Sequence, residues 1–279
     1  MTLPLSGPMS ASMINVELGR AGTAPFDING TPERTLAGVP SGTIKFSDFY
    51  GKSASSVNLL LHMDALVLTN QVQDYSTYAG NLTLGPQVGV VISTSTFKFG
   101  PGSLFGPGGN LANTDMGSVS AGISPFPRFD MTVQTWTWEF WFNESDATSL
   151  RSLICQRNNF TIGWVITTEG IRAQINGAWT ENALTWGRPS FGAWHYIAVQ
   201  REGATLTAYI DGNRVATRSD ISSFTAASGV PVFLGTAFNS GTENAFKGFI
   251  DEVRFTKNKT VYPGSPATIT PPSAPFPNS

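Results

Sequence analysis

Three carboxylate side chains stand in strand-like stretches of this sequence, where they could do acid–base chemistry. Glu139 lies within residues 136–142, and Asp251 and Glu252 are neighbours within residues 246–257. Hydrolysis of a glycosidic bond uses two carboxyl groups that flank one bond. Neighbours in a strand point to opposite faces, so we expect that Asp251 and Glu252 cannot flank one bond. Glu139 stands alone, and the sequence therefore predicts a protein that is not an enzyme.

Other catalytic signatures are missing as well. The chain has two histidines, His62 and His195, and no G-x-S-x-G motif surrounds a serine, so we interpret both histidines as structural. Residues 106–109 are glycine-rich but lack the Gly-Lys-Ser/Thr of a phosphate loop. No cysteine and histidine cluster has zinc spacing, and the single Cys155 lies in an apolar context typical of a buried side chain.

Sugar binding needs an exposed aromatic side chain beside polar groups. Trp179 and Trp186 are the aromatic candidates, and Asn182 and Arg188 could supply hydrogen bonds. Tryptophan is usually largely buried, so the alternative is that both rings cap the core of the domain.

Composition excludes several classes of partner. Charged residues make up 13% of the chain and the formal net charge is -2, which disfavours a nucleic-acid partner that needs a basic face. No apolar run is long enough to span a bilayer, so we expect no membrane insertion. The first ten residues lack a basic stretch followed by an apolar core, so no secretory signal is predicted.

Residues 1–53 differ from the rest and are expected to form a small α+β module. Serine 10 or 12 can cap a first short helix, and Thr-Pro-Glu at residues 31–33 opens a second one. The expected elements are helices over 13–18 and 31–37, a strand over 43–46 and a helical turn over 47–50. A small polar run, residues 52–56, is a natural linker.

Residues 54–262 carry the alternation of a β domain. The segment 192–216 predicts two strands joined by a turn at 201–203, with a second turn at Asp211-Gly212. Trp138 and Phe140 share one face of strand 136–142 and Trp141 lies on the other, as in a strand buried between layers. Residues 263–279 hold six prolines and are expected to form an extended tail that Phe276 pins to the domain.

Six segments of this domain follow the order found in the laminin-G-like family: LLLHMD, FGPGSL, WEFWF, AWHYIAV, YIDG and FIDEVRFTK. The chain resembles that family over residues 57–262. The resemblance implies a mainly β, concanavalin-A-like jelly-roll β-sandwich, a fold that hosts lectins, glycanases and structural modules alike. Residues 106–110 replace the family's compact Asp-Gly turn, and an insertion at 113–132 follows.

The same resemblance implies a calcium site, because many relatives bind this ion with loop acids. Asp64, Asp74 and Asp251 stand where the family carries acids. Strand alternation places Asp251 on the face of Phe249 and Val253, where an acid needs a hydrogen-bond partner or an ion. The alternative is that hydrogen bonds alone satisfy Asp251.

The N-terminal segment is similar to the leader of tailed-bacteriophage virion proteins, through SGPMS, INVELG, LAGVPSG and DFYGK in this order. This implies a structural protein of the virion, assembled in the bacterial host cytoplasm, as a tail fibre, baseplate or head decoration. The expected partners are other virion proteins, copies of the chain (a trimer by analogy with fibres) and a host-surface glycan. The alternatives are a purely structural component without ligand and a host-wall glycanase.

Overall fold

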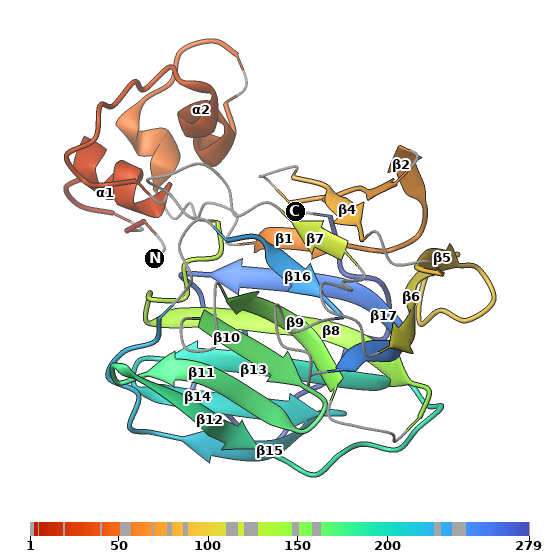
Figure 1. The fold of residues 1–279 in the computed structure, drawn as a ribbon. Helices are drawn as coiled ribbons and strands as arrows, with labels where there is room; N and C mark the ends of the chain where they lie inside the picture. The colour runs from red at the N-terminus through yellow and green to blue at the C-terminus, as the bar shows by residue number, and fades with distance from the viewer. Residues whose placement is uncertain are drawn as a thin grey trace. The chain divides into compact units, whose positions relative to one another are not determined.

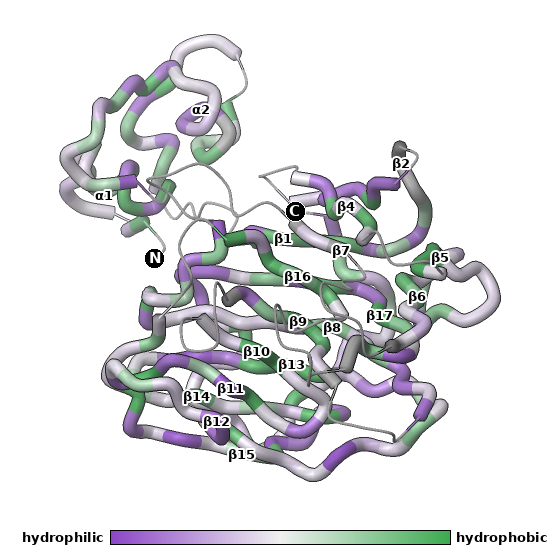
Figure 2. Tube along the Cα trace, in the orientation of Figure 1, coloured by the Kyte–Doolittle hydropathy of each residue, from purple (hydrophilic) through white to green (hydrophobic). Residues whose placement is uncertain are grey.

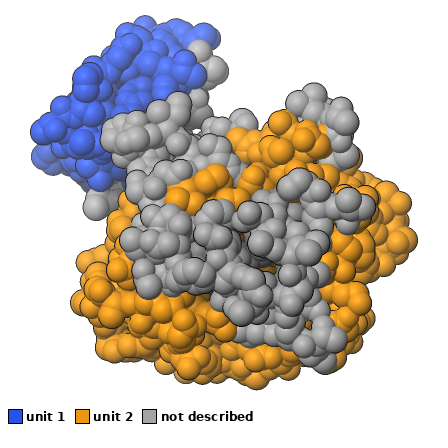
Figure 3. Space-filling view, viewed as in Figure 1, with its two compact units in different colours: residues 1–56 blue, residues 57–279 orange. Residues whose placement is uncertain are grey.

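The computed structural model of the chain divides into two compact units, residues 1–56 and 57–279 (Figures 1 and 3). The structure describes residues 3–4, 6–18, 20–39, 41–50, 57–68, 70–76, 80–85, 89–109, 117–119, 128–146, 151–157, 163–225, 230–235 and 244–278. The expected linker and most of the insertion at 113–132 lie outside these residues. The proline-rich segment belongs to the second unit.

The first unit is held by three short helical elements: α1 (Ala11–Glu17), α2 (Thr31–Ala37) and the 3-10 helix η1 (Phe46–Phe49). The Ser10 hydroxyl accepts a hydrogen bond from the Met13 amide at 3.2 Å, so the expected cap is confirmed. The strand expected over 43–46 is wrong. Ile44 packs into a small core instead, since no described strand of this unit offers a partner. That core also contains Leu3, Ile14, Leu36, Ala37 and Phe49.

The second unit consists of strands, whose bounds are β1 (Val57–Leu61), β2 (Leu66–Leu68), β3 (Gln71–Val72), β4 (Leu82–Leu84), β5 (Val91–Ser93), β6 (Ser103–Gly109), β7 (Gly117–Val119), β8 (Thr135–Glu144), β9 (Arg151–Arg157), β10 (Gly163–Thr167), β11 (Gly170–Ile175), β12 (Ala178–Thr185), β13 (His195–Glu202), β14 (Thr205–Ile210), β15 (Asn213–Arg218), β16 (Val232–Leu234) and β17 (Asn244–Lys257). The strands expected from alternation are present. No described helix of the chain is long and apolar enough to cross a membrane.

These strands form two packed sheets (Figure 1). The first sheet runs β15-β14-β13-β8-β17-β1, with β6 and β5 beside the first half of β17. The second sheet runs β12-β11-β10-β9-β16-β7-β4-β3-β2. Figure 2 shows hydrophobic residues on strands in the middle of the sandwich, such as β10 and β16, whereas edge strand β15 is largely hydrophilic.

Strand β8 shows how the sequence builds the core. Trp136, Trp138, Phe140 and Phe142 alternate toward the second sheet and are buried in the main core cluster. Trp141 faces the other way and joins a separate cluster on the outer face of the first sheet. The prediction that β8 is apolar on both faces is confirmed. Something must cover its outer face, because large apolar side chains there would otherwise contact water.

The C-terminal tail provides that cover. Tyr262, Ile269 and Phe276 pack into the outer-face cluster with Trp141 and Tyr196. Phe276 is buried, with 4% of its surface exposed, and its ring stacks on the Arg254 guanidinium at 3.9 Å. The expectation that Phe276 pins the tail is confirmed.

A β-bulge in β17 changes which side chains reach the outer face. The register with β8 shifts between Asp251 and Arg254, and Glu252 has a positive φ of 51°. Ile250 and Val253 both point into the main core. The expected alternation is therefore wrong at this point, because a bulge puts two successive residues on one side. Asp251 and Glu252 both lie on the outer face, and Asp251 is separated from Val253.

Candidate functional site

One half of the outer face of the first sheet is sealed by the tail over a buried carboxylate. Glu139 is fully buried and accepts hydrogen bonds from the Tyr196 hydroxyl at 2.5 Å and the Tyr262 hydroxyl at 2.8 Å. The Arg254 guanidinium adds Nε at 2.9 Å and Nη2 at 2.7 Å. Burial beside this carboxylate raises the pKa of Tyr196 well above its usual value. All these groups are partnered, and Glu139 is closed off from solvent.

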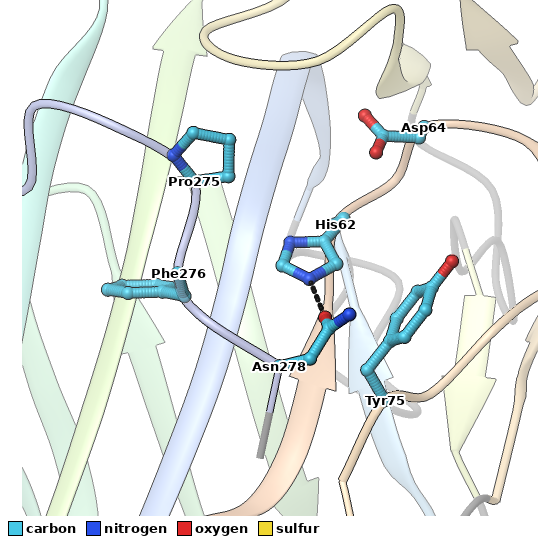
Figure 4. A pocket seen from close by; sticks show the side chains of 6 residues that line it. All are labelled: His62, Asp64, Tyr75, Pro275, Phe276 and Asn278. Atoms are coloured by element: carbon cyan, nitrogen blue, oxygen red, sulfur yellow. Dashed lines mark hydrogen bonds between the residues drawn. The ribbon is translucent and has the colours of Figure 1, made fainter.

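The same tail forms one wall of a cavity of about 310 Å³ beside β1. Its lining combines the end of β1 and the loops after it with the end of the tail (Figure 4). The lining residues are His62, Asp64, Tyr75, Pro275, Phe276 and Asn278. This volume is near the lower end of the range for small-molecule sites in proteins.

His62 fastens the tail at the back of this cavity. Its Nδ1 lies 2.9 Å from Oε1 of Glu252, and its Nε2 lies 2.9 Å from Oδ1 of Asn278 (Figure 4). Glu252 also accepts a hydrogen bond from the Phe276 amide at 2.8 Å. Burial lowers the pKa of His62, but the hydrogen bonds to Glu252 and Asn278 outweigh it and hold the pKa above its usual value. Both ring nitrogens are thus engaged, one by Glu252 and one by Asn278, and His62 links the tail to the bulge.

Asp64, in contrast, lines the cavity without a hydrogen-bond donor. Its Oδ1 is buried with no hydrogen-bond partner. Burial raises the pKa of Asp64, the nearby Glu252 raises it further, and His62 opposes the shift. Asp64 as a whole is partly buried, and its Oδ1 is closed off against the loop that contains Gly100.

The other two acids considered for calcium are already satisfied. Asp74 accepts from the Leu60 amide at 3.0 Å and pairs with the buried Arg128. Asp251 accepts from the amides of Lys98 at 2.8 Å, Phe99 at 3.1 Å and Glu252 at 2.9 Å. Burial nevertheless raises the pKa of Asp251 to about 8. Within the described residues no group of three metal-ligating side chains converges, so Asp64, Asp74 and Asp251 do not fit a shared calcium ion.

The uncovered half of the outer face carries a row of apolar side chains across neighbouring strands. We call Trp194, Phe249, Phe105 and Val91 the aromatic row. Phe249 of β17 is paired with Phe105 of β6, which is paired with Val91 of β5. The Phe105 and Phe249 rings lie 5.0 Å apart, and the Trp194 ring lies 6.4 Å from that of Phe249. Val91 is 48% exposed, and the three rings are half-buried.

Polar groups flank the aromatic row. Asn143 of β8 is the cross-strand neighbour of Phe249. Lys247 lies two residues before Phe249 on the same strand, and its ammonium contacts Asp146 at 2.6 Å. An aromatic surface beside amide, ammonium and carboxylate groups can stack against the C–H face of a sugar and bind its hydroxyls.

The sequence-predicted sugar-binding residues do not come together. Trp186 is buried in the main core, with its Nε1 donating to the Thr168 carbonyl at 3.0 Å, so it offers no platform. Trp179 lies on the outer face of the second sheet and donates to Glu181 at 2.6 Å. The two tryptophans therefore lie on opposite faces of their sheet.

The two polar residues of the predicted sugar-binding set, Asn182 and Arg188, lie in different surroundings. Asn182 is exposed on β12. Arg188 is engaged by Glu144 through Nε at 3.0 Å and Nη2 at 2.5 Å, and this pairing raises the pKa of Arg188. A guanidinium held in this way mainly stabilises the end of β8.

His195, the second histidine of the chain, lies between a serine and an aspartate. Its Nδ1 lies 2.6 Å from Oδ2 of Asp211, and its Nε2 lies 3.0 Å from the Ser190 hydroxyl. The same Nε2 also lies 3.0 Å from the carbonyl oxygen of Ser190. These contacts join Ser190 and Asp211 to His195 and fix the loop before β13.

Sequence reasoning missed the aromatic row and the cavity. Phe105, Phe249 and Trp194 are far apart in sequence, and only the pairing of β6 with β17 joins them. Val91 of β5 and Phe105 of β6 were a usable signal, since apolar side chains on the outer face of an edge strand indicate a contact surface. The cavity had no local signal, because it forms only where residues 275–278 meet β1.

Comparison with known proteins supports the architecture. A family model described as the concanavalin A-like lectin/glucanases superfamily matches residues 117–260. No curated protein matches the chain. Domain 4 of AbnA, an extracellular arabinanase from Geobacillus stearothermophilus solved with arabinotriose, is 14% identical with a TM-score of 0.51, covering 72% of this chain and 92% of that one.

The binding domain of Paraclostridial Mosquitocidal Protein 1 is 13% identical with a TM-score of 0.50, over 72% of this chain. The match covers 48% of that chain, so our chain spans about half of its length. Such low identity shows a shared fold and no more. Because the family model matches more than half of the chain, the chain belongs to the concanavalin A-like lectin/glucanases superfamily, and its second unit is a jelly-roll β-sandwich.

Proposed function

We propose that the chain is a structural protein of a tailed-phage particle whose second unit is a lectin-like domain that binds a host-surface glycan. The aromatic row carries this proposal. Trp194, Phe249 and Phe105 present half-buried rings in line across the sheet, with Asn143 and Lys247 beside them. The arabinanase domain of the same fold, solved with arabinotriose, supports a glycan as the class of ligand.

Residues 1–56 support a place in the virion. Their sequence is similar to the leader of tailed-phage virion proteins, and they form a compact unit with its own core. A unit that folds around its own core can dock on a particle while the sandwich stays free to bind. The proposed setting is a tail fibre, a baseplate or a head decoration, in contact with other virion proteins.

The proposal includes the absence of catalysis. Glu139, the acid in the centre of the first sheet, is buried under the tail and bonded to Tyr196, Tyr262 and Arg254. A general acid must reach the leaving oxygen of its substrate, and this one does not. Incubation with bacterial surface polysaccharides should therefore release no reducing ends, and turnover that Glu139→Gln abolishes would establish a glycanase instead.

A purely structural role is the second candidate, and the same row favours it in one respect. Val91 exposes 48% of its surface at the end of the row, and such an apolar edge can also be buried between copies of the chain. We propose a homo-oligomer, with a trimer as the first expectation. Sedimentation of the full chain measures this, and a monomer in solution and on the particle would contradict it.

Binding of the full-length chain to an array of bacterial capsule and O-antigen polysaccharides tests the glycan proposal. We expect Trp194→Ala to lose binding and Trp179→Ala, a tryptophan on the outer face of the other sheet, to keep it. Loss in Trp179→Ala alone would place the site on the second sheet. No binding to any polysaccharide or to host cells would leave the purely structural role.

A further inference from the structure

A lysine next to the aromatic row has its ammonium over an aromatic ring and not beside an acid. The ammonium of Lys98 lies 3.9 Å from the ring centre of Trp141 and 5.5 Å from that of Phe99. No carboxylate of the described residues lies within ion-pair distance of it, whereas Lys247, which also flanks the row, is paired with Asp146 at 2.6 Å. Lys98 is half-buried, so part of its side chain is open to solvent.

Strand pairing places this ammonium close to the rings of the row. Phe249 is paired with Asn143, and two residues further along the same strands Asp251 is paired with Trp141. Trp194 also packs against the cluster that contains Trp141. Residues two apart in a strand lie on the same face about 7 Å from each other, which is close to the width of one sugar ring. A ring stacked on Phe249 or Trp194 therefore has a substituent within reach of the ammonium over Trp141.

The loop between β5 and β6, which carries Lys98, is fastened to the sheet (Figure 1). The amides of Lys98 and Phe99 donate to Oδ2 of Asp251 at 2.8 Å and 3.1 Å. The Ser103 hydroxyl donates to the Thr96 carbonyl at 2.6 Å. These bonds hold the backbone at Lys98 in place before any ligand arrives, and a preorganised cation loses less entropy on binding.

The acids nearest to this loop in the strand are occupied by other donors. Asp251 is fully buried, and its carboxylate oxygens accept hydrogen bonds from three backbone amides, those of Lys98, Phe99 and Glu252. Glu252 lies 2.9 Å from Nδ1 of His62. The ammonium of Lys98 is therefore available to a negative charge on a ligand.

The position of the ammonium indicates which negative charge fits. A cation over an aromatic face is attracted by the ring and gives up part of its hydration on that side. One ammonium balances the single charge of a carboxylate. The carboxylate of an acidic sugar is attached directly to its ring, so it lies at the distance that separates Trp141 from the row, whereas a phosphodiester lies between two rings.

We propose that the aromatic row binds a sugar unit that carries a carboxylate, with its ring stacked on Trp194 and Phe249 and its carboxylate paired to Lys98. This rests on the proposed glycan-binding function and names the class of glycan, an acidic polysaccharide. Lys98 is then the residue that selects for charge, while the rings of the row supply the contact area.

An array of bacterial capsular polysaccharides, each in native form and with its carboxylates reduced to alcohols, tests the proposal on the full-length chain. We expect the polysaccharides that bind to carry carboxylates, and reduction to weaken their binding at least about tenfold. Lys98→Met, similar in length but uncharged, should bind the native form no better than the reduced one. Lys98→Arg should keep the preference, and so should Lys259→Met, which removes an exposed charge beyond the end of β17.

Equal binding of native and reduced forms by the wild-type chain would overturn the proposal, whether or not any variant folds. A preference for carboxylates that Lys98→Met leaves unchanged contradicts it as well, and so does binding confined to phosphodiester-linked polysaccharides. If neutral or reduced polysaccharides bind as tightly as acidic ones and Trp194→Ala loses them, this proposal fails and the proposed function stands. Absence of binding to every polysaccharide refutes both.

Discussion

Both halves of the outer face of the first sheet carry aromatic residues, but the tail covers them in one half and leaves them open to solvent in the other. Under the tail, the rings of Tyr196 and Tyr262 enclose Glu139, and their polar atoms are bonded to one another. Beyond the tail, the rings of Trp194 and Phe249 are half-buried, and Trp194 packs against the edge of the covered cluster. A covered aromatic face contributes stability, whereas an uncovered one costs solubility and is retained for contact with something else.

The tail covers the sheet and pairs with it at one isolated β-bridge, between Thr268 and Asn213 of edge strand β15, and its prolines keep that pairing short. Proline has no N–H and cannot extend a hydrogen-bond ladder. The tail bonds instead at isolated points, where the Tyr262 amide donates to Gln200 at 3.2 Å and the Phe276 amide donates to Glu252 at 2.8 Å. Backbone hydrogen bonds add to these contacts, since the Arg214 amide donates to the Ala267 carbonyl at 3.0 Å and the Ile269 amide to the Gly212 carbonyl at 2.7 Å. Mutation of the side chains that hold the tail tests how much of the boundary between the two halves depends on them.

The largest expected effect is loss of stability in the covered half. Glu139→Ala should lower the free energy of unfolding by about 3–5 kcal/mol, because the Arg254 charge and two buried hydroxyls lose their partner. Urea denaturation followed by tryptophan fluorescence measures it. Glu181→Ala, whose side chain is 60% exposed, should change stability by less than about 0.5 kcal/mol. Equal costs would mean that the covered network is not structural.

Removal of the ring that anchors the tail comes next. Phe276→Ala should cost about 3 kcal/mol, since a buried ring and its stacking on Arg254 are lost. The matched control is Phe191→Ala, which removes a ring that is 42% exposed and should be nearly neutral. A proteolysis assay would show whether the tail then becomes cleavable while the sandwich stays intact. A tail that resists cleavage in Phe276→Ala would show that the ring does not anchor it.

In the open half we expect the reverse pattern, a binding effect larger than the stability effect. Trp194→Ala should weaken polysaccharide binding by roughly 1–2 kcal/mol, about tenfold or more, as aromatic anchors do in other interfaces. Its unfolding midpoint should move less than that of Phe276→Ala. A large fall in stability with unchanged affinity would assign the aromatic row to packing between subunits.

The smallest effect concerns the boundary itself and depends on pH. The pKa of His62 is raised in the folded state, so its stabilising contribution is full below the unfolded value of 6.5 and is lost as the pH rises through the folded pKa. The raised pKa of Asp251 acts in the same direction up to about pH 8, so the comparison must be with His62→Gln. In His62→Gln the free energy of unfolding should fall less steeply as the pH rises than it does in the wild-type chain. NMR titration measures the pKa of His62 directly, with His195 as the second histidine signal. A His62 pKa at or below 6.5 would contradict the idea that its contacts with Glu252 and Asn278 stabilise the tail.

The sequence by itself determined the strands, the turns and the family. Alternation in β8 and β13 and the turn at Asp211-Gly212 depend on neighbouring residues, and the positive φ of Asp211 bears the turn out. The cap at Ser10 is local in the same way. Such features follow from the backbone preferences of a few adjacent residues, so they are visible without a structure.

Only the tertiary structure decided which of these residues form a site. The bulge at Asp251 and Glu252 cannot be seen in an alternating pattern, and it moved two acids to one face. The aromatic row and the cavity join residues more than a hundred positions apart, through the pairing of β6 with β17 and the return of the tail to β1. Burial and hydrogen bonding depend on such long-range contacts, so the partial exposure of Trp194 and the unpartnered Oδ1 of Asp64 emerge only once the chain is folded.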